Sequence, residues 1–217
     1  PTNPDALGDA IKVGRRGSLT GTVTVTGVQG HVAYPHLAKN PVPDLLSLLG
    51  ALQALTLDEG NERFQPSNLE ITTIDIGNTA TNVIPRQAQA RFNVRFNDIW
   101  SVESLRAKLR QALSDVSGLS CDWSLDFAPD SSDSFLTHDA ALIDALSEAV
   151  EAETGRRPEL STGGGTSDAR FIKNYCPVVE FGLVGQTMHK IDERVATADL
   201  DRLAAIYRRF LDSYFSA

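Results

Sequence analysis

Three stretches of the chain alternate apolar and polar residues with a period of two. Between residues 19 and 25, leucine and valine alternate with threonine. Residues 87–96 place alanine, phenylalanine and valine on one side and glutamine, asparagine and arginine on the other. Residues 121–127 alternate once more. This period predicts three strands, each with one face in a core and one polar face.

Leucines at helical spacing lie between these strands. They recur along residues 41–57, behind prolines that suit the first turn of a helix. A second helix is predicted to begin at its cap, Ser101, and to end at Gly118. With a further strand near 69–76, residues 17–128 follow the order β-α-β-β-α-β, the split βαβ or ferredoxin-like arrangement. Two helices would cover one face of its antiparallel sheet, and the polar face would be free for a partner or a site.

Beyond an Asp- and Ser-rich linker at 129–134, the pattern predicts alternating helices and short strands. We expect a helix closed by Gly155, a strand at 159–161, a buried strand at 177–183 and a final helix over 200–214. This tail is typical of half of a parallel α/β layer. The predicted fold class is therefore α/β plus α+β. Two strands do not make a stable parallel sheet alone, because both faces and both edges need covering, so the organisation itself predicts a missing part.

Composition narrows the classes of partner and compartment. The chain has 20 Lys and Arg against 28 Asp and Glu, a net charge of −8, with no basic cluster for nucleic acid. No apolar run approaches the roughly 18 residues of a membrane span. The two cysteines, Cys121 and Cys176, are far apart and outside any CxxC pair, which favours a reduced, cytoplasmic compartment. The chain opens at Pro1 and its only methionine is Met188, so we expect a fragment of a longer protein.

Two of the four histidines stand where chemistry could occur. His31 follows the first predicted strand, next to Gly30, although spacing alone favours a loop histidine with local hydrogen bonds. His189 follows the predicted strand at 177–183, the position where ligand sites form in α/β sheets. A catalytic zinc site needs three or more protein ligands, and the sequence offers a single plausible one.

The triple glycine at 163–165 is predicted to open a helix, whose amides would favour a carboxylate or a phosphate. A plain tight turn is an equally good interpretation. No lysine follows as it does in a P-loop, which disfavours nucleotide binding. Arg95, at the end of a polar strand face, could fork onto a substrate carboxylate, although a solvated surface arginine is commoner.

Six stretches in collinear order carry a resemblance to a known family. They resemble the succinyl-diaminopimelate desuccinylase branch of the dimetal amidohydrolase, aminoacylase and carboxypeptidase family, which also holds acetylornithine deacetylase and glutamate carboxypeptidase. The sequence GHVAYPHLA-x-NP within the second stretch is the most specific. The stretches are Gly14–Leu19, Gly30–Pro41, Thr81–Pro85, Phe92–Phe96, Gly164–Phe171 and Met188–Glu193.

The resemblance implies a division of the chain into three parts. Residues 1–16 would be a remnant of a catalytic domain and its linker, 17–128 a lid and dimerisation domain, and 129–217 the C-terminal part of the catalytic domain. The implied reaction is hydrolysis of the N-succinyl amide of LL-diaminopimelate, with two divalent metal ions, zinc or cobalt, and a homodimer formed through the lid. The alternatives are an acetylornithine deacetylase or related aminoacylase or carboxypeptidase, and a non-catalytic dimerisation fragment.

The same resemblance assigns roles to individual residues. His189 would bind one metal ion, and His31 would steady the oxyanion of the tetrahedral intermediate in the partner subunit's active site. Asn82 is similar to a lid residue that reaches the same site. The positions that would hold the carboxylates and amine of the substrate are Arg15, Tyr34, Arg95, Ser131, Gly165 and Thr166.

Two departures from the family pattern change what we expect. The other metal ligands of the family, among them an HxD motif and a Glu-Glu pair, precede the position of Pro1. The chain is therefore expected to hold no complete dimetal centre and to be inactive alone. Thr81 stands where the desuccinylases often have a second asparagine, which puts one lid hydrogen bond in question.

Overall fold

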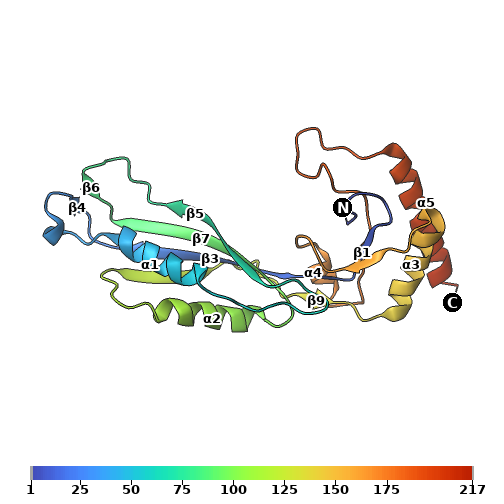
Figure 1. The fold of residues 1–217 in the computed structure, drawn as a ribbon, viewed down its shortest axis with the longest axis horizontal. Coiled ribbons are helices and arrows are strands. Elements are labelled where there is room, and N and C mark those ends of the chain that lie inside the picture. The colour runs from blue at the N-terminus through green and yellow to red at the C-terminus, as the bar shows by residue number, and fades with distance from the viewer. Residues whose placement is uncertain (1, 217) are drawn as a thin grey trace. The chain divides into compact units, whose positions relative to one another are not determined.

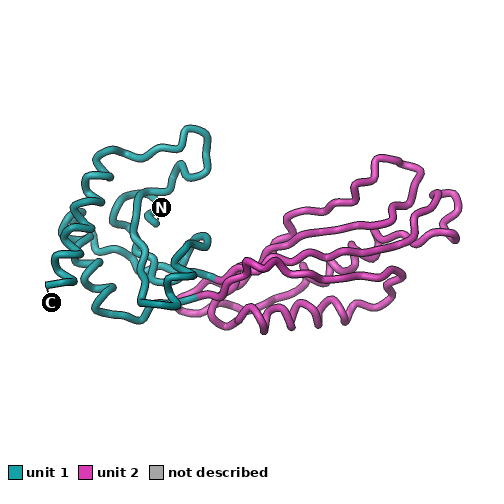
Figure 2. Tube along the Cα trace, turned by 180° about the vertical axis from the view of Figure 1, so that it is seen from behind, with its two compact units in different colours: residues 1–16, 135–217 teal, residues 17–134 magenta. Residues whose placement is uncertain are grey.

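The structure, a computed structural model, describes residues 2–216 and divides into two compact units (Figure 2). Unit 1 comprises residues 1–16 and 135–217, and unit 2 comprises residues 17–134. Unit 2 is thus an insertion in the sequence of unit 1. Among the residues described, no helix has the length and apolar character needed to cross a membrane.

Unit 2 is a four-stranded antiparallel sheet with two helices (Figure 1). Its spatial strand order is β5-β7-β3-β8, and the order along the chain is the predicted β-α-β-β-α-β. The predicted ferredoxin-like part of the fold is therefore confirmed. The elements are β3 (Gly17–Thr26), α1 (Pro41–Gln53), β5 (Asn68–Asp75), β7 (Gln87–Phe96), α2 (Val102–Ser114) and β8 (Asp122–Phe127).

The core of unit 2 lies between the sheet and the two helices. Phe92 and Phe96 of β7 are fully buried, together with the leucines of α1 and α2. Their rings fit because β3 has a glycine opposite each: a Cβ on Gly21 or Gly17 would come within 2.3 Å of the facing phenylalanine. Burying each phenylalanine contributes about 1.5–3 kcal/mol. These two glycines are therefore packing residues.

The boundaries of α2 differ slightly from the prediction. Ser101 caps the helix as predicted, in a capping box with Ser104. The helix ends at Ser114 with Asp115 as its C-cap, and Gly118 follows in a left-handed conformation at φ +78°. The glycine therefore belongs to the connection that follows α2.

Asp44, in the first turn of α1, ties this helix to the start of β8. Its Oδ2 accepts hydrogen bonds from the backbone N–H of Ser120 at 2.8 Å and of Cys121 at 2.7 Å. Burial alone would raise the pKa of Asp44, but the hydrogen bonds from Cys121 and Ser120 outweigh it and lower that pKa. The ionised carboxylate is thus part of the folded state.

We expect Asp44→Ala to lower the free energy of unfolding by about 2 kcal/mol at pH 7, because charge-assisted hydrogen bonds are lost. A lowered folded-state pKa adds stability above the unfolded value of about 3.9, and this stability is lost as the pH falls through the folded pKa. Urea unfolding should therefore show that Asp44→Ala lowers the free energy of unfolding less at pH 3 than at pH 7. Asp122→Ala, at an exposed carboxylate of β8, is the control. An equal loss at both pH values would contradict this explanation.

Unit 1 is built on two short strand pairs and the helix pair α3 and α5. Strand β1 runs parallel to β10, and β2 runs antiparallel to β9. Apolar residues of the first strand, of α3 and of α5 share one core, with Ile11, Val150 and Ile206 fully buried. The elements are β1 (Ala10–Lys12), β2 (Gly14–Arg15), β9 (Phe135–Leu136), α3 (Ala140–Thr154), β10 (Glu159–Ser161), α4 (Ala169–Ile172) and α5 (Thr197–Tyr214).

Two sequence predictions for unit 1 are wrong. Residues 177–183 do not form a continuous strand. The region makes isolated bridges only, at Glu180 antiparallel to Lys12 and at Val184. Between these bridges, side chains bond Gly182: Thr2 Oγ1 accepts from Gly182 N at 2.8 Å, and Asn3 Nδ2 donates to Gly182 O. Leu183 O accepts from the backbone N–H groups of Thr2 and Asn3. The tail is therefore a mixed arrangement, not half of a parallel layer.

The second correction concerns the glycines at 163–165. They do not open a helix, because α4 begins only at Ala169 and spans four residues. Gly155, in contrast, ends α3 in the predicted left-handed conformation, at φ +71°.

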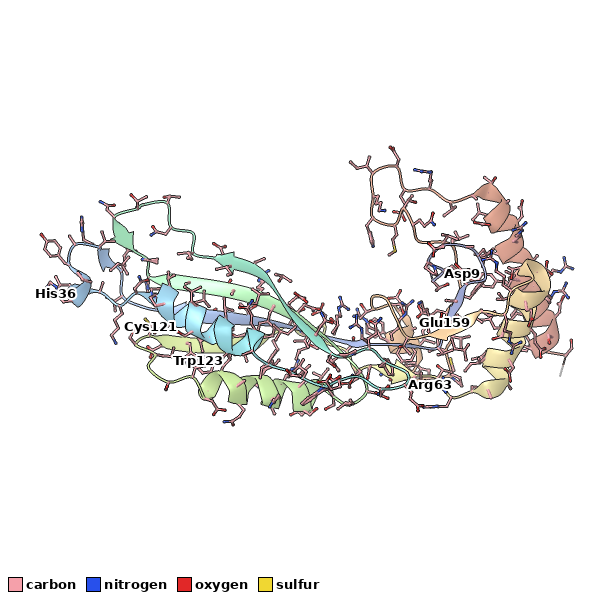
Figure 3. The ribbon with its side chains drawn as sticks, viewed as in Figure 1. Asp9, His36, Arg63, Cys121, Trp123 and Glu159 are labelled. Atoms are coloured by element: carbon pink, nitrogen blue, oxygen red, sulfur yellow. The ribbon has the colours of Figure 1, made fainter. Side chains whose placement is uncertain are left out.

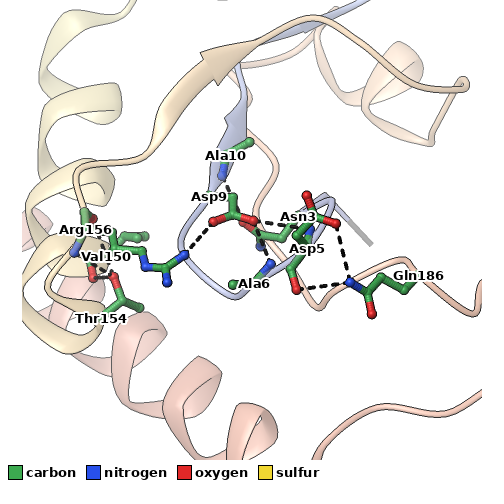
Figure 4. A network of polar contacts seen from close by, with 9 residues as sticks. All are labelled: Asn3, Asp5, Ala6, Asp9, Ala10, Val150, Thr154, Arg156 and Gln186. Carbon is green, nitrogen blue, oxygen red and sulfur yellow. Dashed lines mark hydrogen bonds and ion pairs between the residues drawn. The ribbon is translucent and has the colours of Figure 1, made fainter.

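A polar network holds the first residues of unit 1 in place (Figure 4). Asn3 Oδ1 accepts from Ala10 N at 2.9 Å, and Asp9 Oδ2 accepts from Ala6 N at 2.6 Å. Asp9 also pairs with Arg156 Nη1 at 2.9 Å. The loop before β1 is therefore fixed by side chains at both of its ends.

The linker at 129–134, predicted to begin the C-terminal part of the chain, lies in unit 2. Two backbone hydrogen bonds explain this: Ser18 N to Ser132 O at 2.9 Å and Ser132 N to Ser18 O at 3.0 Å. The segment thus pairs with the beginning of β3. The lid and catalytic roles of the three ranges stay predictions.

Candidate functional site

A cavity of about 610 Å³ in unit 1 brings together four of the residues that the sequence singled out. Arg15, Gly165, Thr166 and His189 come from distant parts of the chain and line the same space. Other wall residues were not predicted as site residues, among them Glu180, Tyr207 and Phe210. The sequence contained a sign that Glu180 is a candidate site residue, because it is a lone acidic residue between the apolar residues Val179 and Phe181.

Arg15 enters this cavity from β2, whose pairing with β9 fixes its backbone. The residue is 7% exposed. Its Nε donates to Glu180 Oε2 at 2.6 Å, and its Nη1 donates to Gly163 O at 3.3 Å. The guanidinium is therefore a fixed positive charge in the wall, with a carboxylate on one side.

The glycine segment next to Arg15 bends at Gly164 and does not form a helix. Gly163 N donates to Ser161 Oγ at 3.2 Å, and Gly164 has φ +101°. A Cβ on Gly164 would lie 2.8 Å from Arg15 Nη1. Glycine is thus required both by the backbone conformation and by the guanidinium. Gly165 lines the cavity beyond this bend.

His189 lies on a loop with unusual backbone geometry. It has φ +61°, and Asp192 in the same loop has φ +62°. Left-handed conformations of this kind cost about 1–3 kcal/mol each and cluster at functional sites. The loop is closed by Thr187, whose Oγ1 donates to Arg194 O at 2.8 Å and accepts from Arg194 N at 3.0 Å.

The described residues do not form a complete metal site. In residues 2–216, no three or more His, Cys, Asp or Glu side chains are placed to hold one ion. His189 could therefore supply a single imidazole, fewer than the three protein ligands typical of catalytic zinc.

A second set of predicted residues meets at one end of unit 2. His31, on β4 (Gly30–His31), pairs with Val83 on β6 (Val83–Ile84). Val32 N donates to Asn82 O at 3.1 Å, and the rings of His31 and Tyr34 lie 5.8 Å apart between centroids. His31, Tyr34 and Asn82 are thus neighbours on an exposed surface.

A hydrogen bond fixes which nitrogen of His31 can donate. The backbone N–H of Ala33 donates to His31 Nδ1 at 3.0 Å. Because Nδ1 accepts this bond, the proton of the neutral ring is on Nε2. His31 therefore presents an N–H donor at Nε2, as the stabilisation of an oxyanion requires.

Arg95 and Ser131 lie at the other end of the sheet of unit 2. Arg95 pairs with Ser18 at the beginning of β3, whereas His31 follows the end of that strand. Ser131 Oγ donates to Ala128 O at 2.9 Å, near the same beginning. Figure 3 shows these two ends of unit 2, with His36 of the 3-10 helix η1 (Pro35–Leu37) at one and Arg63 at the other. The predicted substrate-binding residues of unit 2 therefore form two separate groups.

Comparison with known proteins agrees with this fold. Residues 13–119 match the family described as peptidase dimerisation domain. A crystal structure of the aminopeptidase PepT from Bacillus cereus has a TM-score of 0.77 at 16% identity, over 98% of this chain and 55% of that chain. An M20 family metallo-carboxypeptidase from Sulfolobus solfataricus has a TM-score of 0.77 at 14% identity, over 97% of this chain and 62% of that chain.

Relatives found by sequence have much higher identity to this chain than these two solved structures. The succinyl-diaminopimelate desuccinylase of Methylobacterium sp. (strain 4-46) is 64% identical over 217 residues, covering 100% of this chain and 55% of that protein. The chain thus spans about half the length of the curated relatives it matches. The predicted resemblance is confirmed: residues 13–119 match the family described as peptidase dimerisation domain, and the whole chain is similar to a part of the succinyl-diaminopimelate desuccinylases.

Proposed function

We propose that the whole protein hydrolyses the N-succinyl amide of LL-diaminopimelate to succinate and LL-diaminopimelate. The identity of 64% to a desuccinylase supports this assignment. The structural observation that carries it is the unit 1 cavity, which places Arg15, Gly165, Thr166 and His189 around one space. A buried arginine beside a glycine bend suits a substrate with several carboxylates.

The proposed reaction adds water to the amide carbonyl, breaks the C–N bond and transfers a proton to the leaving amine. In our proposal the site holds two divalent metal ions, either zinc or cobalt. When bound, these ions would activate the water and polarise the carbonyl. His189 is the metal ligand that we propose from this chain. Arg15 would hold a carboxylate, and His31 would donate its Nε2–H to the oxyanion.

The remaining residues are proposed to bind the substrate or the partner. Tyr34 and Asn82 adjoin His31, so they would act at the same end of unit 2. Arg95 and Ser131 would act at the other end, next to the point where the chain passes between the units. We propose that unit 2 is a lid that forms a homodimer, as the description of its family suggests. The free thiols Cys121 and Cys176 agree with a cytoplasmic location.

Steady-state kinetics of the whole protein with zinc would test the proposal. We expect kcat/KM for N-succinyl-LL-diaminopimelate to exceed that for N-acetylornithine by about 10²-fold or more, because a site built for a charged group rejects an analogue lacking it. The 217-residue chain with added Zn²⁺ should show no turnover, since its described residues hold no complete metal site. A preference for acetylornithine would contradict the proposed substrate. Robust turnover by the 217-residue chain alone would contradict the expectation that the metal site needs residues outside this chain.

A further inference from the structure

An ion pair in the wall of the unit 1 cavity had not been singled out from the sequence. Glu180 Oε2 accepts a hydrogen bond from Arg15 Nε at 2.6 Å, and the two side chains are 21% and 9% exposed. Both residues line the cavity that also holds His189. A charge-assisted hydrogen bond of this length between half-enclosed groups is stronger than one between surface side chains.

The guanidinium is held from a second side. Its Nη1 donates to Gly163 O, and the missing Cβ of Gly164 leaves space for that nitrogen. Within residues 2–216, these two acceptors are the hydrogen-bond partners of Arg15. The other N–H groups on its Nη nitrogens are therefore available to a ligand in the cavity, whose wall includes Gly165 and Thr166.

The backbone at Glu180 and Phe181 is held by hydrogen bonds to two other elements. Its backbone N and O bond to the O and N of Lys12, both at 2.9 Å. The next carbonyl, that of Phe181, accepts a hydrogen bond from the hydroxyl of Tyr207. The backbone that carries the carboxylate is thus anchored to β1 and to α5, so the carboxylate can set the position of a longer and more flexible side chain.

We propose that Glu180 is a positioning residue that makes Arg15 meet a substrate carboxylate through its Nη nitrogens. This inference rests on the proposed function, in which Arg15 binds such a carboxylate. An arginine can receive a carboxylate along its Nε side or at its Nη end. Because Glu180 occupies Nε, the Nη end is left for the substrate. Glu180 thereby decides the direction from which the succinylated substrate is recognised, and it acts on binding rather than on bond cleavage.

The first test is a kinetic comparison in the whole protein. Glu180→Ala should raise KM for N-succinyl-LL-diaminopimelate about tenfold to a hundredfold, with kcat changed less than about threefold. Glu180→Gln should restore most of the loss, because its amide oxygen can still accept from Arg15 Nε. Glu159→Ala, at an exposed carboxylate of β10 in the same unit (Figure 3), should leave KM unchanged.

A double-mutant cycle shows whether Glu180 works through Arg15. If it does, Arg15→Ala and Arg15→Ala/Glu180→Ala should have the same KM within about twofold, whereas independent effects would multiply. If Glu180→Ala does not fold, the Glu180→Gln variant tests the positioning role by itself. A KM within about threefold of that of the unchanged protein supports the role, and a rise in KM of about tenfold overturns it.

The outcomes also separate this inference from the proposed function. Multiplying effects in the cycle, or equal losses in kcat and kcat/KM, would overturn the positioning role and leave the desuccinylase assignment standing. Absence of any hydrolysis of N-succinyl-LL-diaminopimelate by the unchanged whole protein would overturn the proposed function, and the inference with it.

Discussion

Replacing His31 by alanine in the whole protein should lower kcat about 10²–10³-fold, the usual effect of removing one oxyanion donor. The structure supports a donor role because Ala33 N–H occupies Nδ1 and so leaves the proton on Nε2. The ring is exposed at the end of unit 2, so its removal leaves no cavity in the core. The dimer that we propose should therefore keep its stability.

The measurements are steady-state kinetics and analytical ultracentrifugation. His36→Ala is the matched control, since His36 is another exposed imidazole of the same segment, and its ring is 6.4 Å from that of Tyr34. It should keep turnover near that of the unchanged protein. Turnover unchanged by His31→Ala would instead favour unit 2 as a dimerisation module without a part in catalysis.

Asp58→Ala should lower the free energy of unfolding by about 3 kcal/mol at pH 7, because several charge-assisted hydrogen bonds are lost together. Asp58 Oδ1 accepts from Gly60 N at 2.8 Å, Ser67 N at 3.1 Å and Asn97 Nδ2 at 2.6 Å. Its Oδ2 accepts from Trp100 Nε1 at 2.9 Å. One carboxylate therefore closes the loop before β5 and joins it to the residues that follow β7.

The pH dependence gives a second check on Asp58. Burial would raise the pKa of Asp58, but hydrogen bonds from Ser67, Gly60 and Asn97 outweigh this and lower it. The stabilisation should thus be complete well above the unfolded pKa of about 3.9 and fade as the pH falls through the folded value. Urea unfolding at pH 7 and pH 3 measures it, with exposed Glu59→Ala as control. A loss as small as that of Glu59→Ala would contradict the role of the network.

The sequence predicted the sheet and helices of unit 2 well because each of these elements buries one face. Alternation in β7 and the leucine spacing in α1 are direct consequences of that burial. The pairing of Gly21 with Phe92 could not be predicted, since it depends on the register between β3 and β7. Such contacts are set by tertiary packing rather than by local pattern.

Unit 1 was harder because its backbone is satisfied by side chains from distant positions. The apolar run at 177–183 resembles a strand, yet Thr2 and Asn3 take the hydrogen bonds of Gly182. Local pattern cannot report partners nearly the whole chain away. For the same reason the sequence offered His189 and Arg15 as separate candidates, and only the fold places them around one cavity with Glu180.

The hydrogen bonds between Ser18 and Ser132 have a consequence for how such a protein can change over evolution. The two ends of residues 17–134 are adjacent, and β2 and β9, which flank them in the sequence, are already paired antiparallel through Arg15 and Phe135. A short turn in place of the whole insertion would join these two strands as a hairpin. Unit 2 can therefore be gained, lost or exchanged in evolution as one continuous segment, while unit 1 keeps its own hydrophobic core.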